Sequence, residues 1–253
     1  MQGFKGKVVL VTGGSQGIGL AVVRRFTLHG AVVVTCGRTQ EKWDRAQTTF
    51  PELTSVDFFR VDLADRKALS EWFKYLRSKF QNLDVAINNA SSEVKSTGCF
   101  SSDTEEAILE AIQIGLLVPL WCCKEEIALM SKGSSIVNVS SINGLRATPG
   151  AAAYCAAKHG LEGLTKSLAL EYAAQGIRIN AVAPGVTMTP RWEQRLAMSP
   201  TPAELKKDIE QMVPVKRFGS ADEIANAIVW LSSPEASYVI GHTLVVDGGL
   251  SQT

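Results

Sequence analysis

Short runs of β-branched residues alternate with amphipathic stretches along the whole chain, and this alternation limits the possible folds more than any other feature. Seven runs have the length and residue types of strands, at residues 7–11, 31–35, 55–60, 84–87, 135–139, 178–182 and 243–246. Several are almost entirely apolar, which is typical of parallel strands that helices cover on both faces. Between them lie helical patterns, such as the apolar stripe of Leu69, Trp72, Phe73, Leu76 and Phe80. The chain is therefore predicted to form an α/β fold, a doubly wound parallel sheet of about seven strands with helices on both faces.

Nothing in the sequence divides the chain into two cores, because it has no internal repeat, no low-complexity segment and no linker. We therefore expect residues 1–253 to form a single domain. Residues 186–214 interrupt the alternation, since they combine four prolines with three methionines and Trp192. We expect this segment to be a lid over a substrate pocket; a surface excursion without a role in binding is the alternative.

The composition favours a small molecule as the partner. The formal net charge of +1, without a basic stripe, indicates that the chain does not bind nucleic acid. The longest apolar stretch, residues 107–123, contains Glu110, Gln113 and Pro119 and is shorter than the ~20 residues that cross a bilayer, so we expect a buried helix and no membrane partner. The absence of a secretory signal and five cysteines without CxxC spacing predict a cytoplasmic protein with reduced thiols and no metal site.

The first predicted strand runs directly into a glycine-rich turn, Thr12-Gly13-Gly14-Ser15-Gln16-Gly17-Ile18-Gly19, after which a helical pattern begins. Glycines let the backbone turn sharply and approach a pyrophosphate closely, and the next helix presents free N–H groups to the anion. Such turns are common, but this position between a first strand and a helix is typical of a Rossmann-type dinucleotide site. We therefore expect a cofactor to be bound by Gly13, Ser15, Gln16, Gly17, Ile18 and Gly19.

The end of the second predicted strand indicates which dinucleotide is bound. An acidic residue at this point would hold the ribose 2′-hydroxyl of NAD, but the chain has Gly37 followed by Arg38. A guanidinium can bind a 2′-phosphate and lie over the adenine ring. We therefore predict that NADP(H) is preferred over NAD(H); the alternative is that Arg38 is an ordinary exposed loop residue.

Reduction of a carbonyl requires an acid that protonates the developing alkoxide and a donor that polarises the oxygen. Tyr154 and Lys158 are four residues apart, so they share one face of a helix, and the ammonium is expected to lower the pKa of the phenol. A Tyr-x-x-x-Lys pair is common by chance, but here Ser141 follows directly on strand 135–139. That position is the carboxyl edge of the sheet, where ligands bind in such folds. Ser140 would point to the other face.

These features together resemble the short-chain dehydrogenase/reductase family, and the resemblance covers essentially the full chain. The motifs are the turn at residues 12–19, Asn88-Asn89-Ala90, the set Ser141, Tyr154 and Lys158, residues 180–185 with Thr189, and Val246-Asp247-Gly248-Gly249. The resemblance implies an oxidoreductase that uses NADP(H) to transfer a hydride between the nicotinamide and a small carbonyl or secondary alcohol. It also implies a homo-oligomer, either a tetramer or a dimer.

The resemblance further implies roles for single residues. Ser141 would polarise the carbonyl oxygen, Tyr154 would exchange the proton, and Lys158 would lower the pKa of the phenol and bond the nicotinamide ribose. The cofactor would also be lined by Asp62 at the adenine amino group, by Leu63, Asn89 and Ala90, and by Pro184, Gly185, Thr187 and Thr189 at the carboxamide.

Three positions depart from the family pattern. Ser91 replaces a glycine, Gln16 stands where many NADP-dependent members have a basic residue, and Gly115 aligns with a catalytic asparagine that anchors water in a proton relay. Because a glycine in mid-helix costs up to ~1 kcal/mol relative to alanine, packing is not expected to explain Gly115. A cofactor-binding regulator with little catalysis is therefore one alternative function. Among enzymes, a 3-oxoacyl-thioester reductase is another.

Overall fold

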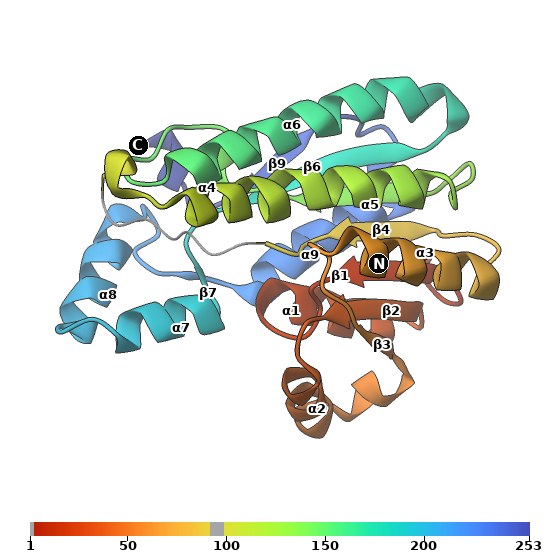
Figure 1. The fold of residues 1–253 in the computed structure, drawn as a ribbon, viewed down its shortest axis with the longest axis horizontal. Coiled ribbons are helices and arrows are strands. Elements are labelled where there is room, and N and C mark those ends of the chain that lie inside the picture. The colour runs from red at the N-terminus through yellow and green to blue at the C-terminus, as the bar shows by residue number, and fades with distance from the viewer. Residues whose placement is uncertain (1–2, 92–98) are drawn as a thin grey trace.

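The computed structural model describes residues 3–91 and 99–253, and it confirms the seven predicted strands (Figure 1). They are β1 (Val8–Thr12), β2 (Val32–Gly37), β3 (Asp57–Arg60), β4 (Val85–Asn88), β5 (Ser135–Val139), β6 (Arg178–Pro184) and β9 (Thr243–Val246). All pair in parallel, in the order β3-β2-β1-β4-β5-β6-β9. The chain therefore reverses its direction of winding between β3 and β4, and the carboxyl ends of β1 and β4 border the crevice where such sheets bind ligands.

Each face of the sheet is covered by its own layer of helices. In β1, Val9 and Val11 join one core cluster while Leu10 joins the other, because successive side chains of a strand point to opposite faces. The first cluster includes side chains of α1 (Gly17–Leu28), α2 (Gln40–Thr49) and α9 (Ala221–Ser232). The second includes side chains of α3 (Arg66–Lys79), α5 (Val118–Ile127) and α6 (Ala152–Tyr172). Burial on both faces explains why the strands are apolar without alternation.

Residues 186–214 form two further helices outside these layers. The short strand β7 (Thr187–Met188) pairs with β8 (Gly219–Ser220), and between them lie α7 (Pro190–Ala197) and α8 (Pro202–Met212), at the left of Figure 1. Both helices begin with proline, which is favourable at the first helical position because that N–H has no partner there. The function of this segment as a lid stays a prediction.

The apolar stretch around residues 107–123 lies within a continuous helical segment, Glu105–Ile127. This segment consists of α4 (Glu105–Ile112), a π-helical turn at Gln113–Leu117, and α5. Among the described residues it is the one helix long and apolar enough to cross a membrane, although 33% of its most apolar window is buried inside the fold. Its inner side contributes Val118, Cys122 and Cys123 to the core, as expected for a packed helix, while Leu109 and Leu120 are exposed.

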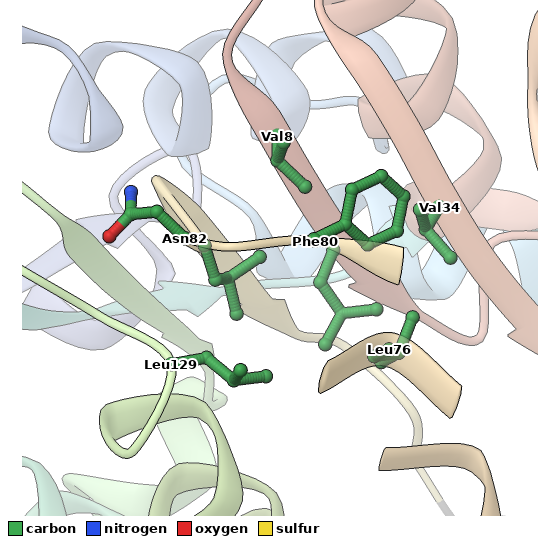
Figure 2. A pocket seen from close by; sticks show the side chains of 8 residues that line it. Val8, Val34, Leu76, Phe80, Asn82 and Leu129 are labelled. Atoms are coloured by element: carbon green, nitrogen blue, oxygen red, sulfur yellow. The ribbon is translucent and has the colours of Figure 1, made fainter. Parts of the chain in front are cut away.

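A small apolar hollow lies at the amino-terminal edge of the sheet, opposite the edge where ligands are expected (Figure 2). It is lined by Val8, Leu10, Val34, Leu76, Phe80, Asn82, Leu83 and Leu129. None of these side chains is titratable or nucleophilic, so the hollow offers no chemistry.

The core between α5 and the sheet contains a carboxyl group, that of Glu126, which has no exposed surface. Its Oε2 accepts a hydrogen bond of 3.0 Å from Asn88 Nδ2, which also donates to Asn138 Oδ1 at 3.0 Å. Oε1 of Glu126 has no partner among the described residues. Burial disfavours the charged form and raises the pKa of Glu126 to about 8, against a smaller lowering by the bond from Asn88.

We expect Glu126→Gln to remove a pH dependence of stability. Between its ordinary pKa of 4.5 and about 8, the folded protein keeps a proton that the unfolded chain loses, so wild-type stability falls as pH rises across this window. The total loss is roughly 5 kcal/mol, at about 1.4 kcal/mol per unit of pKa difference. Urea unfolding from about pH 5 to about pH 9 measures it. The control is Glu125→Gln, whose carboxylate pairs with Arg77 at the surface. Equal slopes for wild type and Glu126→Gln would contradict the prediction.

Candidate active site

The glycine turn after β1 has the conformation expected of a phosphate cradle. Gly13 and Gly17 have φ angles of +71° and +57°, in the left-handed region that side chains disfavour. A Cβ on Gly14 would lie 2.1 Å from Thr35 Oγ1, and one on Gly19 would lie 2.2 Å from the carbonyl oxygen of Gly13. Glycine is therefore required at these positions, both by backbone conformation and by close approach.

The amino terminus of α1 is prepared for an anion. Its N-cap residue, Gln16, makes no side-chain cap, and the first turn contains no acidic residue. Side chains cap three of the described helices, α3 by Asp65, α4 by Thr104 and α9 by Ser220, whereas α2, α6, α7 and α8, like α1, have no side-chain cap. The free N–H groups and the positive end of the α1 dipole fit a pyrophosphate, so the residues present are compatible with a dinucleotide.

The turn is held against the end of β4 by side chains. Thr12 Oγ1 accepts hydrogen bonds from the backbone N–H groups of Asn89 at 3.0 Å and Ala90 at 3.1 Å. Asn89 Nδ2 donates in return to the carbonyls of Thr12 at 3.0 Å and Gly13 at 3.1 Å. The side-chain amide of Asn89, a residue expected to line the cofactor, therefore stabilises the conformation of the turn. The contribution of Thr12 was not expected from sequence, since a threonine at a strand end has no distinctive signal.

The residues expected at the adenine lie at the carboxyl ends of β2 and β3, the same edge as the glycine turn. Arg38 is exposed and makes no hydrogen bond or ion pair with the described part of the chain. Gly37 leaves room for the side chain of Ser15, because a Cβ atom on Gly37 would lie 3.0 Å from Ser15 Oγ. Asp62 is exposed and accepts at Oδ1 from the N–H of Ala64 at 3.0 Å, whereas Leu63 is buried. The carboxylate of Asp62 therefore also shapes its own turn.

The fold brings the three expected catalytic residues together at the end of β5 and the start of α6. Ser141 follows β5 and accepts at Oγ from the N–H of Asn143 at 3.2 Å. The hydroxyls of Ser141 and Ser91 lie near the phenol of Tyr154, close enough to lower its pKa. Lys158 is buried; its Nζ lies 5.8 Å from the centre of the Tyr154 ring and donates to the carbonyl of Val139 at 2.9 Å.

The pKa of the tyrosine differs from the sequence-based expectation. Burial raises the pKa of Tyr154, and the charge of Arg191 and the hydrogen bonds of Ser141 and Ser91 only partly oppose it. Burial likewise lowers the pKa of Lys158 to about 8; Arg191 adds to this effect and Glu162 opposes it. The expected lowering of the phenol's pKa is therefore wrong for this structure, because desolvation outweighs the nearby charges.

Gly115 lies in the π-helical turn and is buried against α6. A Cβ on Gly115 would lie 2.9 Å from the Cβ of Ala157, which stands between Tyr154 and Lys158 in α6. The expectation that packing does not explain this glycine is therefore wrong: a side chain here would push α6 away. The π-turn, a feature often found at functional sites, faces α6 at this point.

We expect Gly115→Asn to destabilise the protein, by about 1–3 kcal/mol for an overpacked core position. Part of this loss should be recovered in the double variant Gly115→Asn/Ala157→Gly, because removal of the Ala157 methyl group frees the space. Thermal unfolding and steady-state kinetics of both variants check this. Full stability of Gly115→Asn alone would show that the contact does not limit packing.

The residues expected at the carboxamide form the link from β6 to α7. Pro184 ends β6, and a Cβ on Gly185 would lie 2.6 Å from that of Asp247. Thr187 is buried, and Thr189 Cγ2 is 3.5 Å from the Cβ position of Gly17. The link therefore reaches the glycine turn. Sequence reasoning missed Arg191, whose only signal was a basic residue two positions after Thr189.

A doubly wound sheet with a glycine cradle at its switch point, and a serine, tyrosine and lysine beside it, defines a dinucleotide-dependent oxidoreductase. A family model described as enoyl-(acyl carrier protein) reductase matches residues 13–251. The chain belongs to the short-chain dehydrogenase/reductase family, whose members use a nicotinamide cofactor and act on alcohols and ketones.

Two relatives and one solved structure are similar to this chain over nearly its full length. A 3beta-hydroxysteroid dehydrogenase of Mediterraneibacter gnavus is 34% identical, over 98% of this chain and 96% of the relative. A 3-oxoacyl-(acyl-carrier-protein) reductase of Thermotoga maritima is also 34% identical, over 98% of both chains. The crystal structure of levodione reductase has a TM-score of 0.92 and 30% identity, covering 99% of this chain and 100% of that one. This likeness confirms the Rossmann-type fold.

Proposed function

We propose that the protein is an NADP(H)-dependent reductase of small ketones or dehydrogenase of the matching secondary alcohols, with Ser141, Tyr154 and Lys158 as its catalytic residues. The observation that carries the proposal is the proximity of the Ser141 and Tyr154 side chains at the carboxyl edge, with buried Lys158 one helical turn further along α6. Gly13, Ser15, Gln16, Gly17, Ile18 and Gly19 would hold the pyrophosphate.

Each catalytic side chain has a role that its position supports. The bound nicotinamide supplies or accepts the hydride. Ser141 donates a hydrogen bond to the carbonyl oxygen, and Tyr154 gives its proton to the oxygen as negative charge develops there. Lys158, charged below about pH 8, stabilises the phenolate that remains. The alcohol leaves, and Tyr154 recovers its proton from solvent.

Tyr154→Phe should lower kcat by about 100-fold or more, as expected for loss of a general acid, and should leave NADPH binding nearly unchanged. The measurement is NADPH oxidation with a panel of ketones, aldehydes, quinones and 3-oxoacyl thioesters. Tyr172→Phe, at the end of the same helix, is the matched control. Turnover that survives in Tyr154→Phe would remove the tyrosine from the mechanism.

The preference for NADP(H) rests on Arg38, an exposed guanidinium without a partner in residues 3–91 and 99–253, at the end of β2. Arg38→Gln should raise the KM for NADPH by about 10-fold or more, the value of a charge-assisted bond, and leave the KM for NADH unchanged. Arg45→Gln, on the exposed side of α2, is the control. An equal change for both cofactors would show that Arg38 does not recognise the 2′-phosphate.

Two alternatives have support of their own. The similarity to a 3-oxoacyl-(acyl-carrier-protein) reductase favours thioester substrates, which the same panel tests. Gly115 in place of the usual asparagine favours a cofactor-binding regulator, for which NADPH would bind without turnover of any substrate.

We also propose that the protein forms a homotetramer or dimer in the cytoplasm, with a small molecule as its substrate. The exposed apolar side chains Leu109, Leu120, Leu170, Tyr238 and Ile240 offer contact surfaces for further copies. The segment 186–214 would close over the substrate.

A further inference from the structure

Gly144 ends the short helical turn that follows Ser141, at Ile142–Gly144. The N–H of Asn143 donates to Ser141 Oγ at 3.2 Å, and the N–H of Gly144 donates to the carbonyl oxygen of Ser141 at 2.8 Å. This turn therefore holds both oxygens of Ser141. Because Oγ accepts a hydrogen bond there, its own hydrogen stays available for donation. A shift of the turn would move the hydroxyl group of Ser141 with it.

Gly144 is also the point where this turn meets the backbone of α6. It is buried, and a Cβ atom on Gly144 would lie 2.9 Å from the carbonyl oxygen of Lys158 and 3.1 Å from its carbonyl carbon. The same atom would lie 2.9 Å from Ser140 Oγ. The φ angle of Gly144 is not positive, so its backbone conformation suits any residue, and the lack of space alone requires glycine. A helix backbone cannot rotate aside as a side chain can, so a side chain here would push the turn and α6 apart.

The contact with Gly144 is one of two that hold Lys158 against the end of β5. The other is the hydrogen bond of 2.9 Å from Lys158 Nζ to the carbonyl oxygen of Val139. Val139 precedes Ser141 by two residues and Gly144 follows it by three, so Lys158 contacts the chain on both sides of Ser141. Tyr154 lies one turn earlier in the same helix. These two contacts therefore set the position of Ser141 relative to the other two side chains.

We propose that Gly144 is a positioning residue for the reaction: its missing side chain lets the turn that holds Ser141 pack on the backbone of Lys158, which fixes the serine hydroxyl relative to Tyr154. The proposal rests on the function proposed above. It adds that the reactive geometry depends on a residue with no reactive group of its own. A misplacement of about 1 Å can cost about 100-fold in rate, so one added methyl group is expected to be enough.

The test is Gly144→Ala, assayed with NADPH and the ketone that the wild type reduces fastest. Well below the unfolding temperature of the variant, kcat should fall by about 10- to 100-fold, because the serine hydroxyl is displaced. NADPH should still bind, because the glycine turn after β1 is unchanged. A role in stability alone would lower the unfolding temperature and leave kcat of the folded protein as it was. Crystal structures of the variant and the wild type should show Ser141 Oγ further from the Tyr154 hydroxyl in the variant.

Gly163→Ala is the matched control, since a Cβ atom on Gly163, in the same helix, meets no atom of the described residues within 4 Å. Its kcat should equal that of the wild type. Ser140→Ala removes the other neighbour of the added methyl group. Because Ser140 Oγ has no partner among the described residues, this variant should also keep the wild-type kcat. The double variant Ser140→Ala/Gly144→Ala should stay as slow as Gly144→Ala, because the contact with the backbone of Lys158 remains.

A wild-type kcat in Gly144→Ala overturns the proposal, and so does recovery in the double variant, since the contact with Ser140 would then be the cause. If Gly144→Ala does not fold, the double variant, which keeps only the contact with Lys158, takes its place. An unfolded double variant beside a folded Ser140→Ala makes the contact purely structural and also overturns the proposal. A wild type that binds NADPH but reduces no ketone rejects the reductase function. The crystal structures then decide on Gly144, and an unchanged distance between Ser141 and Tyr154 overturns its role.

Discussion

The hydrogen bonds between the glycine turn and the end of β4 are the contact on which the rest of the site depends. Thr12 Oγ1 accepts from two backbone N–H groups at the end of β4, and the side-chain amide of Asn89 donates to two carbonyls of the glycine turn. These four hydrogen bonds join Thr12 to Asn89, which lies 77 residues further along the chain. They lie where the order of the strands reverses. Because they hold the turn in shape before a ligand binds, little ordering remains to be done when the cofactor arrives.

Helix α6 is held against the sheet by a second set of buried polar contacts. Asn138 of β5 donates to Thr165 of α6 at 2.9 Å, and Lys158 donates to the carbonyl of Val139 at 2.9 Å. Asn88 links this set to Glu126 in α5. In a low dielectric such bonds are strong, but any polar atom left without a partner costs stability. Oε1 of Glu126, which has no partner among the described residues, is such an atom. The other oxygen of this carboxyl group is bonded to Asn88 at the end of β4, so the protonation state of Glu126 affects a strand that borders the site.

Close packing sets the distance between the π-helical turn and α6. Gly115 presses against Ala157, so the residues on either side of Ala157 along the helix, Tyr154 and Lys158, keep their positions relative to Ser141. Burial of the phenol and the ammonium favours the neutral form of each group, so it raises the pKa of Tyr154 and lowers the pKa of Lys158.

The sequence by itself determined the fold class, and it predicted the members of the site. Apolar runs that lack alternation indicate strands buried on both faces, and their alternation with helices predicts a doubly wound parallel sheet. The order of the strands came from the structure. The glycine turn and the Tyr154–Lys158 spacing are local, so they could be identified without coordinates. Only the tertiary structure decided the direction of the pKa shift of Tyr154, the reason for Gly115 and the influence of Arg191 on the pKa values of Tyr154 and Lys158. These depend on burial and on neighbours distant in sequence, which spacing along the chain does not contain.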